Sequence, residues 1–335
     1  MTRRPTIAMA MMDGLFERAF TAEHLDRLGA VGTVLDPAPL TRFDDARARE
    51  LLADADVLLG HWGCPTLDAG VLECAPRLKM FAYAAGTVKW QVTDAVWDRD
   101  LLVTSAAAAN AVPVAEYTLA MILLANKGVL LVRELQRDPS VRVPLDLTAV
   151  GNVGKTIGIV GASAVGRLVI ELLRPFALQV RCYDPYLGAD EAARLGVVKD
   201  DDLVELCRNV DVLSLHAPDI ESTRSMLGTE HFAALRDGAV FINTARPALV
   251  DQAALERELV AGRISAVLDV ATPDPLPRDH PLLGLANVFV TPHVAGSMGT
   301  ELTRMADLAV TEVERFAAGL PPLYPVRRAD LDRIA

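Results

Sequence analysis

A strand, a glycine-containing turn and a helix follow one another without interruption near the middle of this 335-residue chain. The apolar run Thr156–Val160 predicts the strand, and a helical pattern continues over Arg167–Phe176. Between them, Gly161 permits a tight turn and Gly166 lets the helix pack closely on the strand, so that the helix N-terminus can present unpaired N–H groups to a pyrophosphate. This order is typical of the first unit of a dinucleotide-binding α/β domain, and no other segment constrains the fold as strongly.

Two further residues of this segment indicate which dinucleotide is bound. Ser163 stands where a glycine normally lets the backbone approach the phosphates, so its side chain must either turn aside or bind a phosphate oxygen itself. Asp184 ends the next apolar run, just before Pro185, where a carboxylate accepts the ribose hydroxyls and repels the 2′-phosphate of NADP. The segment therefore predicts NAD as the cofactor. An ordinary structural turn, with Asp184 as a cap, is the alternative interpretation.

Short apolar runs alternate with helical patterns through most of the chain, which predicts an α/β fold with two doubly wound parallel sheets. The expected strands of the first domain are Thr6–Met11, Val31–Leu35, Val57–Gly60, Lys79–Ala84 and Leu102–Ser105. Those of the second domain are Thr156–Val160, Leu178–Tyr183, Val212–His216, Ala239–Asn243, Ile264–Asp269 and Val288–Thr291. A long helix is expected to open at Pro113, because proline presets the φ angle. Gly299–Gly319 is expected to form one helix that packs back on the first domain, and no strand is expected in the tail Leu320–Ala335.

Composition and charge exclude several classes of protein. With 51% hydrophobic residues the chain can bury a large core, and its net charge of −11 argues against a surface that binds nucleic acid through clustered Lys and Arg. No membrane span is expected, because the longest apolar run, Val114–Leu124, is short and contains Glu116. The first residues show no signal-peptide core, which predicts a cytoplasmic protein.

The four cysteines, Cys64, Cys74, Cys182 and Cys207, show no spacing typical of a metal site, so no metal is expected. We interpret them as reduced structural thiols. Cys64 lies in a loop next to His61, Trp62 and Gly63, and a catalytic role for its thiol is the less favoured alternative.

Three strands of the second domain are followed by polar or charged segments, namely Asn243–Arg246, Asp269–Pro275 and Thr291–His293. An open parallel sheet binds its ligands at the carboxyl ends of its strands. We therefore expect these three segments to lie near the phosphate turn and to carry the chemistry of the site.

Several short motifs occur in one order along the chain and are far more specific together than any one alone. They are Asn110–Ala111 with Val114–Glu116, the phosphate turn Gly161–Gly166, Leu215–Pro218, Asn243–Arg246, Leu268–Val270 and Thr291–Gly296. By these motifs the chain resembles the D-isomer-specific 2-hydroxyacid dehydrogenase family over nearly its whole length. The resemblance implies a flavodoxin-like substrate domain, residues 1–113 with 300–335, and a Rossmann NAD-binding domain, residues 114–299.

The resemblance also assigns roles to three residues. It implies that Arg246 holds the substrate, that His293 is the acid/base and that Asp274 orients the histidine. These residue types suit the reduction of a 2-keto acid, because imidazole titrates near neutral pH and a guanidinium can pair with a carboxylate through two hydrogen bonds. The family usually has glutamate in place of Asp274 and glycine in place of Pro247, so the shorter acid must lie closer to the histidine or leave the pair loose. Asp269 is the second candidate for the orienting acid.

The remaining contacts that the resemblance implies are with the cofactor and the substrate. The residues expected to bind NAD are Gly161, Ser163, Ala164, Val165, Gly166, Asp184, Pro185, His216, Ala217, Pro218, Thr223, Thr244, Ala245, Asp269 and Gly296. Those expected to bind the substrate are Ala84, Ala85, Gly86, Lys89, His61 and Trp62, together with Arg246 and His293. The alternative for Lys89 is a solvated side chain, and the alternative for Trp62 is packing in the core or at an interface. His216 lies in a segment that lines the cofactor mostly through its backbone, so no acid/base role is expected for it.

The resemblance implies an NAD-dependent enzyme that interconverts a small 2-keto acid and its D-2-hydroxy acid. It further implies a homodimer formed through the nucleotide-binding domains. A corepressor-like protein that uses NAD only to stabilise a binding scaffold is the alternative, because such proteins keep residues like Arg246 and His293. A formate-type dehydrogenase is less favoured, because Asp274 supplies an acid partner that the histidine of such a site lacks.

Overall fold

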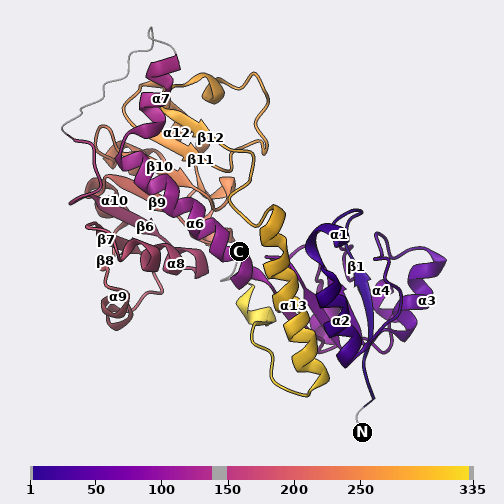
Figure 1. The fold of residues 1–335 in the computed structure, drawn as a ribbon. Coiled ribbons are helices and arrows are strands. Elements are labelled where there is room, and N and C mark those ends of the chain that lie inside the picture. Colours follow the sequence, from indigo (N-terminus) through magenta and orange to yellow (C-terminus); the bar gives the residue numbers. More distant parts are fainter. Residues whose placement is uncertain (1–2, 138–148, 332–335) are drawn as a thin grey trace. The chain divides into compact units, whose positions relative to one another are not determined.

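The computed structural model describes residues 3–137 and 149–331. The chain divides into two compact units: unit 1 is Met1–Asn110 with Ser297–Arg333, and unit 2 consists chiefly of Ala111–Gly296. The boundaries expected from the sequence, after residues 113 and 299, lie close to these junctions. Each unit has its own sheet (Figure 1). Each also has its own hydrophobic core.

Unit 1 contains a six-stranded sheet in the order β13-β5-β4-β3-β1-β2. Its strands are β1 (Thr6–Ala10), β2 (Thr33–Val34), β3 (Val57–Gly60), β4 (Met80–Tyr83), β5 (Leu102–Ser105) and β13 (Pro325–Val326). β1 to β5 are parallel, as expected, whereas β13 pairs antiparallel with β5.

The expectation of no strand in the tail is therefore wrong. The buried carboxylate of Glu312 accepts hydrogen bonds of 2.6 to 3.1 Å from the N–H groups of Leu323 and Tyr324. These bonds hold the tail beside the sheet, where an edge strand tolerates Pro325. Sequence patterning misses this strand because a distant carboxylate, and not a local apolar alternation, fixes its place.

The helices of unit 1 are α1 (Phe16–Ala19), α2 (Ala22–Val31), α3 (Ala46–Asp54), α4 (Ala69–Cys74), α5 (Asp94–Asp98) and α13 (Leu302–Ala317). α13 is preceded by a 3₁₀ turn, η4 (Gly299–Glu301), so the helix expected over 299–319 begins slightly later. Met305 and Val313 of α13 are fully buried in the core of unit 1. The Asp307 carboxylate binds the buried His24 ring of α2 at 3.0 Å. α13 therefore packs on the first unit.

Unit 2 contains a seven-stranded parallel sheet in the order β12-β11-β10-β9-β6-β7-β8. Its strands are β6 (Thr156–Val160), β7 (Gln179–Tyr183), β8 (Val198–Asp200), β9 (Val212–Leu215), β10 (Val240–Asn243), β11 (Ser265–Leu268) and β12 (Val288–Val290). The sequence does not predict β8, a short edge strand with two charged side chains that is held by the ion pair of Asp200 with Arg181. The strand order reverses between β6 and β9, and open α/β sheets bind their ligands at such a point.

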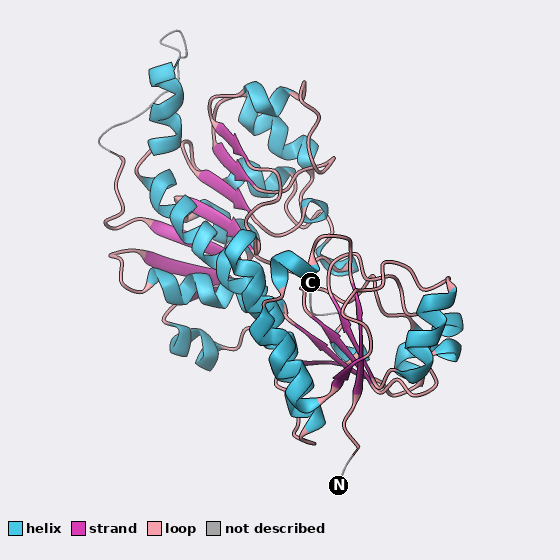
Figure 2. Ribbon diagram, turned by 45° about the vertical axis from the view of Figure 1, so that its right-hand side comes forward, coloured by secondary structure: helices cyan, strands magenta, loops and turns pink. Residues whose placement is uncertain are grey.

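Helices cover both faces of this sheet (Figure 2). They are α6 (Ala107–Asn126), which starts in unit 1, α7 (Val129–Arg137), α8 (Ala164–Leu173), α9 (Ala189–Leu195), α10 (Leu203–Arg208), α11 (Thr229–Ala234) and α12 (Gln252–Val260). Short 3₁₀ turns in the two units are η1 (Glu221–Thr223), η2 (Pro247–Leu249), η3 (Pro281–Gly284) and η5 (Arg328–Asp330). Phe241 and Ile242, neighbours in β10, belong to two different apolar clusters. Because successive strand residues point to opposite faces, both faces of the sheet are buried.

The long helix α6 begins earlier than expected. Pro113 lies inside the helix, so the expectation that it opens there is wrong. The alanine-rich stretch from Ala107 favours a helix, and the proline lacks only the N–H that would bind the carbonyl one turn earlier.

By length and composition α6 is also the one helix among the described residues that could cross a membrane. The apolar run expected from the sequence is shorter than this helix and contains Glu116. In the structure, Ala115, Thr118 and Ile122 of α6 are fully buried in unit 2. Core helices of water-soluble proteins have the same length and composition, so the composition of α6 alone does not make it a membrane span.

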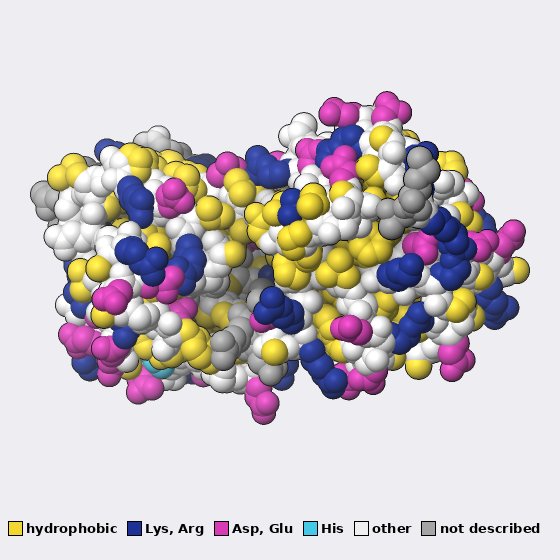
Figure 3. Space-filling model, turned by 90° about the horizontal axis from the view of Figure 1, so that it is seen from below, with side chains coloured by type: hydrophobic (Ala, Val, Ile, Leu, Met, Phe, Trp, Pro, Cys, Tyr) yellow, Lys and Arg dark blue, Asp and Glu magenta, His cyan; other side chains and the backbone are white. Residues whose placement is uncertain are grey.

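Charges of both signs share the face of the molecule shown in Figure 3. Lys and Arg side chains lie there beside Asp and Glu side chains, with hydrophobic side chains between them. Elsewhere in the described residues, arginines such as Arg42 and Arg208 form ion pairs with acids close by in the sequence. The basic groups of this face are therefore interspersed with acidic ones and not gathered in one patch.

Candidate active site

The phosphate turn between β6 and α8 requires its two glycines. Gly161 has a φ of +98°, and a Cβ there would lie 2.6 Å from the backbone nitrogen of Ala217. A Cβ on Gly166 would lie 2.1 Å from the carbonyl oxygen of Gly161. The turn, the start of α8 and the backbone after β9 are therefore packed too closely for any side chain, which leaves main-chain groups at the surface of the turn.

Ser163 turns its side chain toward the helix and not outward. Its Oγ accepts a hydrogen bond from the N–H of Gly166 at 3.3 Å, which caps α8, and its φ of −67° suits any residue. The N–H groups of Ala164 and Val165 find no acceptor within the described part of the chain. Two unpaired N–H groups at the start of a ten-residue helix form a place for an anionic phosphate, so this turn fits the pyrophosphate of NAD.

Asp184, which follows β7, is fixed against the same turn. Its Oδ2 accepts the N–H of Ala162 and its Oδ1 accepts the N–H of Tyr186, each at 2.7 Å. No basic side chain forms an ion pair with Asp184 in the parts of the chain that the structure describes. A carboxylate oxygen has two lone pairs, so both oxygens can still accept hydroxyl groups. The residue therefore fits the ribose diol that the sequence assigns to it.

Asp184→Ala is expected to weaken NADH binding at least about tenfold, because two charge-assisted hydrogen bonds to the ribose are lost. It should also narrow the difference in affinity between NADH and NADPH, because the carboxylate no longer repels the 2′-phosphate. Fluorescence titration with each nucleotide measures both effects. Asp201→Ala, which removes an exposed carboxylate paired with Lys199, is the matched control. An unchanged dissociation constant for NADH in Asp184→Ala would contradict the assignment.

The backbone of the loop after β9 lies close to the phosphate turn. Burial lowers the pKa of His216 to about 3, so this ring stays neutral and cannot serve as an acid/base near pH 7. Its Nε2 lies 2.8 Å from the hydroxyl of Ser214. The Thr223 hydroxyl of η1 donates to the carbonyl of Pro218 at 2.6 Å and accepts the N–H of Ile220 at 3.1 Å, which fixes the rest of the loop.

His293 and Asp274 lie in direct contact. The Nδ1 of His293 donates to Oδ2 of Asp274 at 2.8 Å, so the acid reaches the histidine although it is one methylene shorter than a glutamate. Half of the histidine side chain (51%) is exposed, compared with 26% of the Asp274 side chain. Because Nδ1 is occupied, Nε2 is the nitrogen that can exchange a proton with a ligand.

The backbone of His293 is held in an unusual conformation by Asp269. His293 has a φ of +56°, which few residues other than glycine adopt, and its N–H donates to the carbonyl of Asp269 at 2.9 Å. The buried Asp269 carboxylate accepts the N–H groups of Val294 at 2.8 Å and Ala295 at 3.0 Å, and the hydroxyl of Thr291 at 2.6 Å. Asp269 therefore holds the loop together. The imidazole is bonded to Asp274 and not to Asp269. The expected contact of Asp269 with the cofactor stays a prediction.

Arg246 lies in the loop after β10, directly before η2, which begins at Pro247. Its guanidinium donates to the carbonyl of Ala245 at 2.7 Å, and no acidic side chain pairs with it within the described ranges. Asn243 fixes the loop, because its side chain accepts the N–H of Ala245 at 3.0 Å and donates to the carbonyl of Arg246 at 3.2 Å. A half-buried guanidinium without a carboxylate partner is suited to bind an anionic substrate.

The other residues expected to contact the substrate belong to unit 1. Ala84 and Ala85 are fully buried after β4, and the N–H groups of Gly86 and Thr87 have no acceptor among the described residues. Lys89 is partly buried, and its own N–H donates to the Thr87 hydroxyl at 3.3 Å. The structure describes these residues within unit 1, so their contact with a substrate stays a prediction.

His61 and Trp62 follow β3 in the same unit. Burial lowers the pKa of His61 to about 4, and its Nδ1 accepts the N–H of Trp62 at 2.7 Å. Trp62 is partly buried and packs against the core of unit 1, as expected if it is a packing residue. Burial raises the pKa of the nearby Cys64 thiol, which disfavours the reactive thiolate. A catalytic role for Cys64 therefore has no support.

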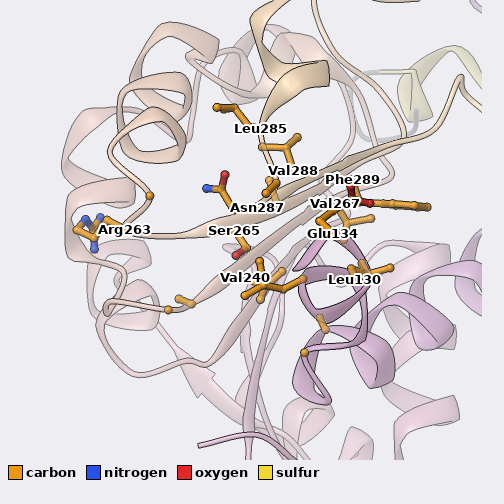
Figure 4. Close-up of a pocket in the computed structure, with 18 of the residues that line it drawn as sticks. Leu130, Glu134, Val240, Arg263, Ser265, Val267, Leu285, Asn287, Val288 and Phe289 are labelled. Carbon is orange, nitrogen blue, oxygen red and sulfur yellow. The ribbon is translucent and has the colours of Figure 1, made fainter. Parts of the chain in front are cut away.

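A hollow of about 1310 Å³ in unit 2 lies mainly at the amino ends of the strands, whereas these loops follow the carboxyl ends. Val240 and Ser265, the first residues of β10 and β11, line it together with Phe289 and Leu130 (Figure 4). The loops of Arg246 and His293 follow the other ends of β10 and β12. This hollow therefore does not mark the candidate site.

Two residues that contact the site loops were not predicted. The Tyr117 hydroxyl lies 2.8 Å from that of Thr291, and the Thr118 hydroxyl lies 3.1 Å from that of Thr244. Both belong to α6, far from those loops in the sequence. The motif Val114–Glu116, directly before them, is the nearest signal in the sequence.

The chain is similar to several known proteins. The family model described as the NAD binding domain of D-isomer specific 2-hydroxyacid dehydrogenase matches residues 119–295. D-3-phosphoglycerate dehydrogenase of Methanocaldococcus jannaschii is 33% identical over 291 residues, which cover 86% of this chain and 55% of that protein. Glyoxylate reductase of Korarchaeum cryptofilum is 32% identical over 279 residues, covering 82% of this chain and 83% of that protein.

Among solved structures, a phosphoglycerate oxidoreductase from Rhizobium etli superposes with a TM-score of 0.80 at 25% identity. The match covers 97% of this chain and 99% of that one. The chain spans about half the length of the phosphoglycerate dehydrogenases that it matches, but most of the length of the glyoxylate reductase.

Proposed function

Because the chain belongs to the D-isomer-specific 2-hydroxyacid dehydrogenase family, whose members are NAD-binding oxidoreductases, we propose that it interconverts a 2-keto acid and its D-2-hydroxy acid. The observation that carries this proposal is the direct contact between His293 and Asp274 at 2.8 Å. It supplies an oriented acid/base in the same unit as a phosphate turn that fits NAD. Unit 2 is the NAD-binding domain, and unit 1 is the proposed substrate domain.

Arg246 is the proposed anchor of the substrate. A 2-keto acid has a carboxylate next to its carbonyl group, and a planar guanidinium can bind both oxygens of the carboxylate or bridge to the carbonyl oxygen. The absence of an acidic partner for Arg246 in the described ranges leaves its donors available for this purpose.

His293 is the proposed proton donor in the direction of reduction. NADH, when bound, supplies the hydride that reduces the carbonyl carbon. A proton must then reach the carbonyl oxygen, and the Nε2 of His293 donates it while Nδ1 stays bonded to Asp274. The Asp274 carboxylate favours the imidazolium form and fixes which nitrogen faces the substrate. In the oxidative direction, the same nitrogen removes the hydroxyl proton.

The substrate is proposed to be a small 2-keto acid. Relatives act, by their names, on glyoxylate and on D-3-phosphoglycerate, and the glyoxylate reductase matches this chain over most of its length. Glyoxylate and 2-keto acids with short side chains are therefore the first candidates, with D-3-phosphoglycerate as a candidate for oxidation.

The test is an assay of NADH oxidation with a panel of 2-keto acids of increasing side-chain size, starting with glyoxylate. We expect at least one member to be reduced, with the D-hydroxy acid as the product of any substrate that becomes chiral. D-3-phosphoglycerate with NAD tests the reverse direction. If folded protein that binds NADH turns over none of these compounds, the proposed activity is wrong and the corepressor-like alternative gains support. Exclusive formation of the L-isomer would contradict the stereochemical part of the proposal.

The named relatives are dehydrogenases and reductases, which favours an enzyme over a scaffold that only binds NAD. Assembly as a homodimer and a cytoplasmic location remain proposals that follow from the resemblance. Light scattering in solution tests the first, with a mass of twice that of the 36.0 kDa chain expected.

A further inference from the structure

We propose that two consecutive side chains of α6 are positioning residues that hold the two loops of the proposed active site separately: Tyr117 holds the loop of His293, and Thr118 holds the loop of Arg246. The kinetic consequences rest on the proposed function. The tethering itself rests only on contacts within unit 2.

Tyr117 reaches the histidine loop through a chain of hydrogen bonds. Its hydroxyl lies 2.8 Å from Oγ1 of Thr291, and that Oγ1 lies 2.6 Å from Oδ1 of Asp269. A carboxylate can only accept, so Thr291 donates to Asp269 and Tyr117 donates to Thr291. Burial raises the pKa of the Tyr117 phenol, and the charge of Asp269 adds to this rise. The phenol therefore keeps its proton and remains a donor at neutral pH.

This chain ends on the group that fixes the backbone around His293. The Asp269 carboxylate is 1% exposed and has no ion-pair partner in the described segments, so hydrogen bonds alone compensate its burial. Two of these bonds come from the N–H groups of Val294 and Ala295. The φ of +56° at His293 is strained for a residue with a side chain and persists only where neighbouring contacts enforce it. Removing the outermost donor, Tyr117, is therefore expected to loosen the loop that carries the imidazole.

Thr118 tethers the other loop by a different contact. Its hydroxyl donates to the carbonyl of Val114 at 2.8 Å and lies 3.1 Å from the hydroxyl of Thr244. Because the only proton of the Thr118 hydroxyl is engaged, Thr244 is the donor in the second contact. Thr118 is fully buried and Thr244 is 8% exposed, so neither hydroxyl has ready access to water in its place. Thr244 lies two residues before Arg246. Holding Thr244 in place therefore fixes the backbone from which the Arg246 side chain extends.

The two tethers act on different loops because the two side chains leave α6 in different directions. Successive residues of an α-helix are rotated by roughly 100°. One helix therefore contacts both the loop of the acid/base and the loop of the substrate anchor, and each contact can be removed without touching the other.

Hydrogen exchange measured by mass spectrometry tests the tethers in the protein without substrate. Tyr117→Phe is expected to raise exchange about fivefold in the segment 291–297 and to leave the segment 243–249 unchanged, as loss of one hydrogen bond predicts. Thr118→Val is expected to do the reverse, and Thr118→Ser should restore wild-type exchange. Tyr324→Phe, which removes an exposed phenol in unit 1, is the control. No change in the predicted segment, or an equal rise in both segments and in β6, would overturn the proposal.

Kinetics then separate the two roles. With a 2-keto acid that the wild type reduces, Tyr117→Phe should slow single-turnover oxidation of NADH roughly five- to twentyfold and leave the affinity for oxalate, a mimic of two adjacent substrate oxygens, unchanged. Thr118→Val should weaken oxalate binding and raise KM about fivefold with a smaller effect on the rate. Thr291→Val, which also removes the donor to Asp269, should slow the reaction at least as much as Tyr117→Phe, and the double variant should be no slower than Thr291→Val alone. Thr291→Ser, which keeps the hydroxyl, should react like the wild type. If Tyr117→Phe and Thr118→Val change the same constant, either the single-turnover rate or the affinity for oxalate, the two residues do not position the two loops separately. If the wild type turns over no keto acid, the proposed function fails, and hydrogen exchange still decides the tethers.

Discussion

Replacing His293 by asparagine is expected to lower kcat roughly 10²- to 10⁴-fold, because the variant has no group that can transfer a proton near neutral pH. Asparagine is preferred to alanine because it adopts a positive φ more readily, so the strained backbone at this position can persist. The affinity for NADH should stay within about twofold, because this side chain does not belong to the phosphate turn. Steady-state assays and fluorescence titration of NADH measure the two quantities.

Asp274→Asn provides the matched comparison for His293→Asn. An amide can keep a hydrogen bond to the ring, but it cannot stabilise the imidazolium by charge. We expect kcat to fall about 10- to 100-fold, less than for His293→Asn, again with NADH affinity unchanged. A His293→Asn variant that is as active as the wild type would remove the histidine from the mechanism. A larger loss in Asp274→Asn than in His293→Asn would make the carboxylate, and not the imidazole, the acid/base.

The nucleotide-binding half of the fold could be predicted because its determinants are local. Thr156–Val160 forms β6 as expected, and the steric need for Gly161 and Gly166 is visible in the order strand, turn, helix. The role of Ser163 could be narrowed only to two alternatives, because the choice depends on whether its hydroxyl meets the N–H of Gly166 or a ligand.

The contacts that the sequence could not predict join residues far apart in the chain. Tyr117 contacts Thr291 although 174 positions separate them in the sequence. Whether Asp274 reaches His293 depends on how their two loops pack. The tail strand β13 depends on Glu312 in the same way. Local patterns record the period and capping of an element, whereas tertiary packing decides which polar side chains of distant elements meet.

At the start of α6 a local preference is overruled by the residues before it. Proline favours the first turn of a helix, but Pro113 lies inside α6 because the alanine-rich residues before it already form helix. The earlier start also gives α6 the length that a membrane span would need. One face of α6, with Ala115 and Ile122, packs in a core cluster of unit 2.

Replacing Arg246 by glutamine is expected to lower kcat/KM for the keto acid roughly 10²- to 10⁴-fold, because two hydrogen bonds between a guanidinium and a carboxylate are lost, each worth about 1.5–3 kcal/mol. Most of the loss should appear in KM and in the affinity for oxalate, since Arg246 binds the substrate before the proton moves. The affinity for NADH should change little. Arg208→Gln, which removes an exposed arginine paired with Glu205, is the control and should leave kcat/KM unchanged.

Arg246→Lys separates the charge of the side chain from its shape. Lysine keeps a positive charge but presents a compact ammonium group that cannot bind both carboxylate oxygens in the fixed geometry of a guanidinium. If bidentate binding matters, Arg246→Lys should lose nearly as much affinity for oxalate as Arg246→Gln. If charge alone matters, lysine should restore most of that affinity, and the proposed two-bond geometry would be wrong. If both variants keep the wild-type kcat/KM, the Arg246 guanidinium does not bind the substrate, and the proposed anchor is wrong.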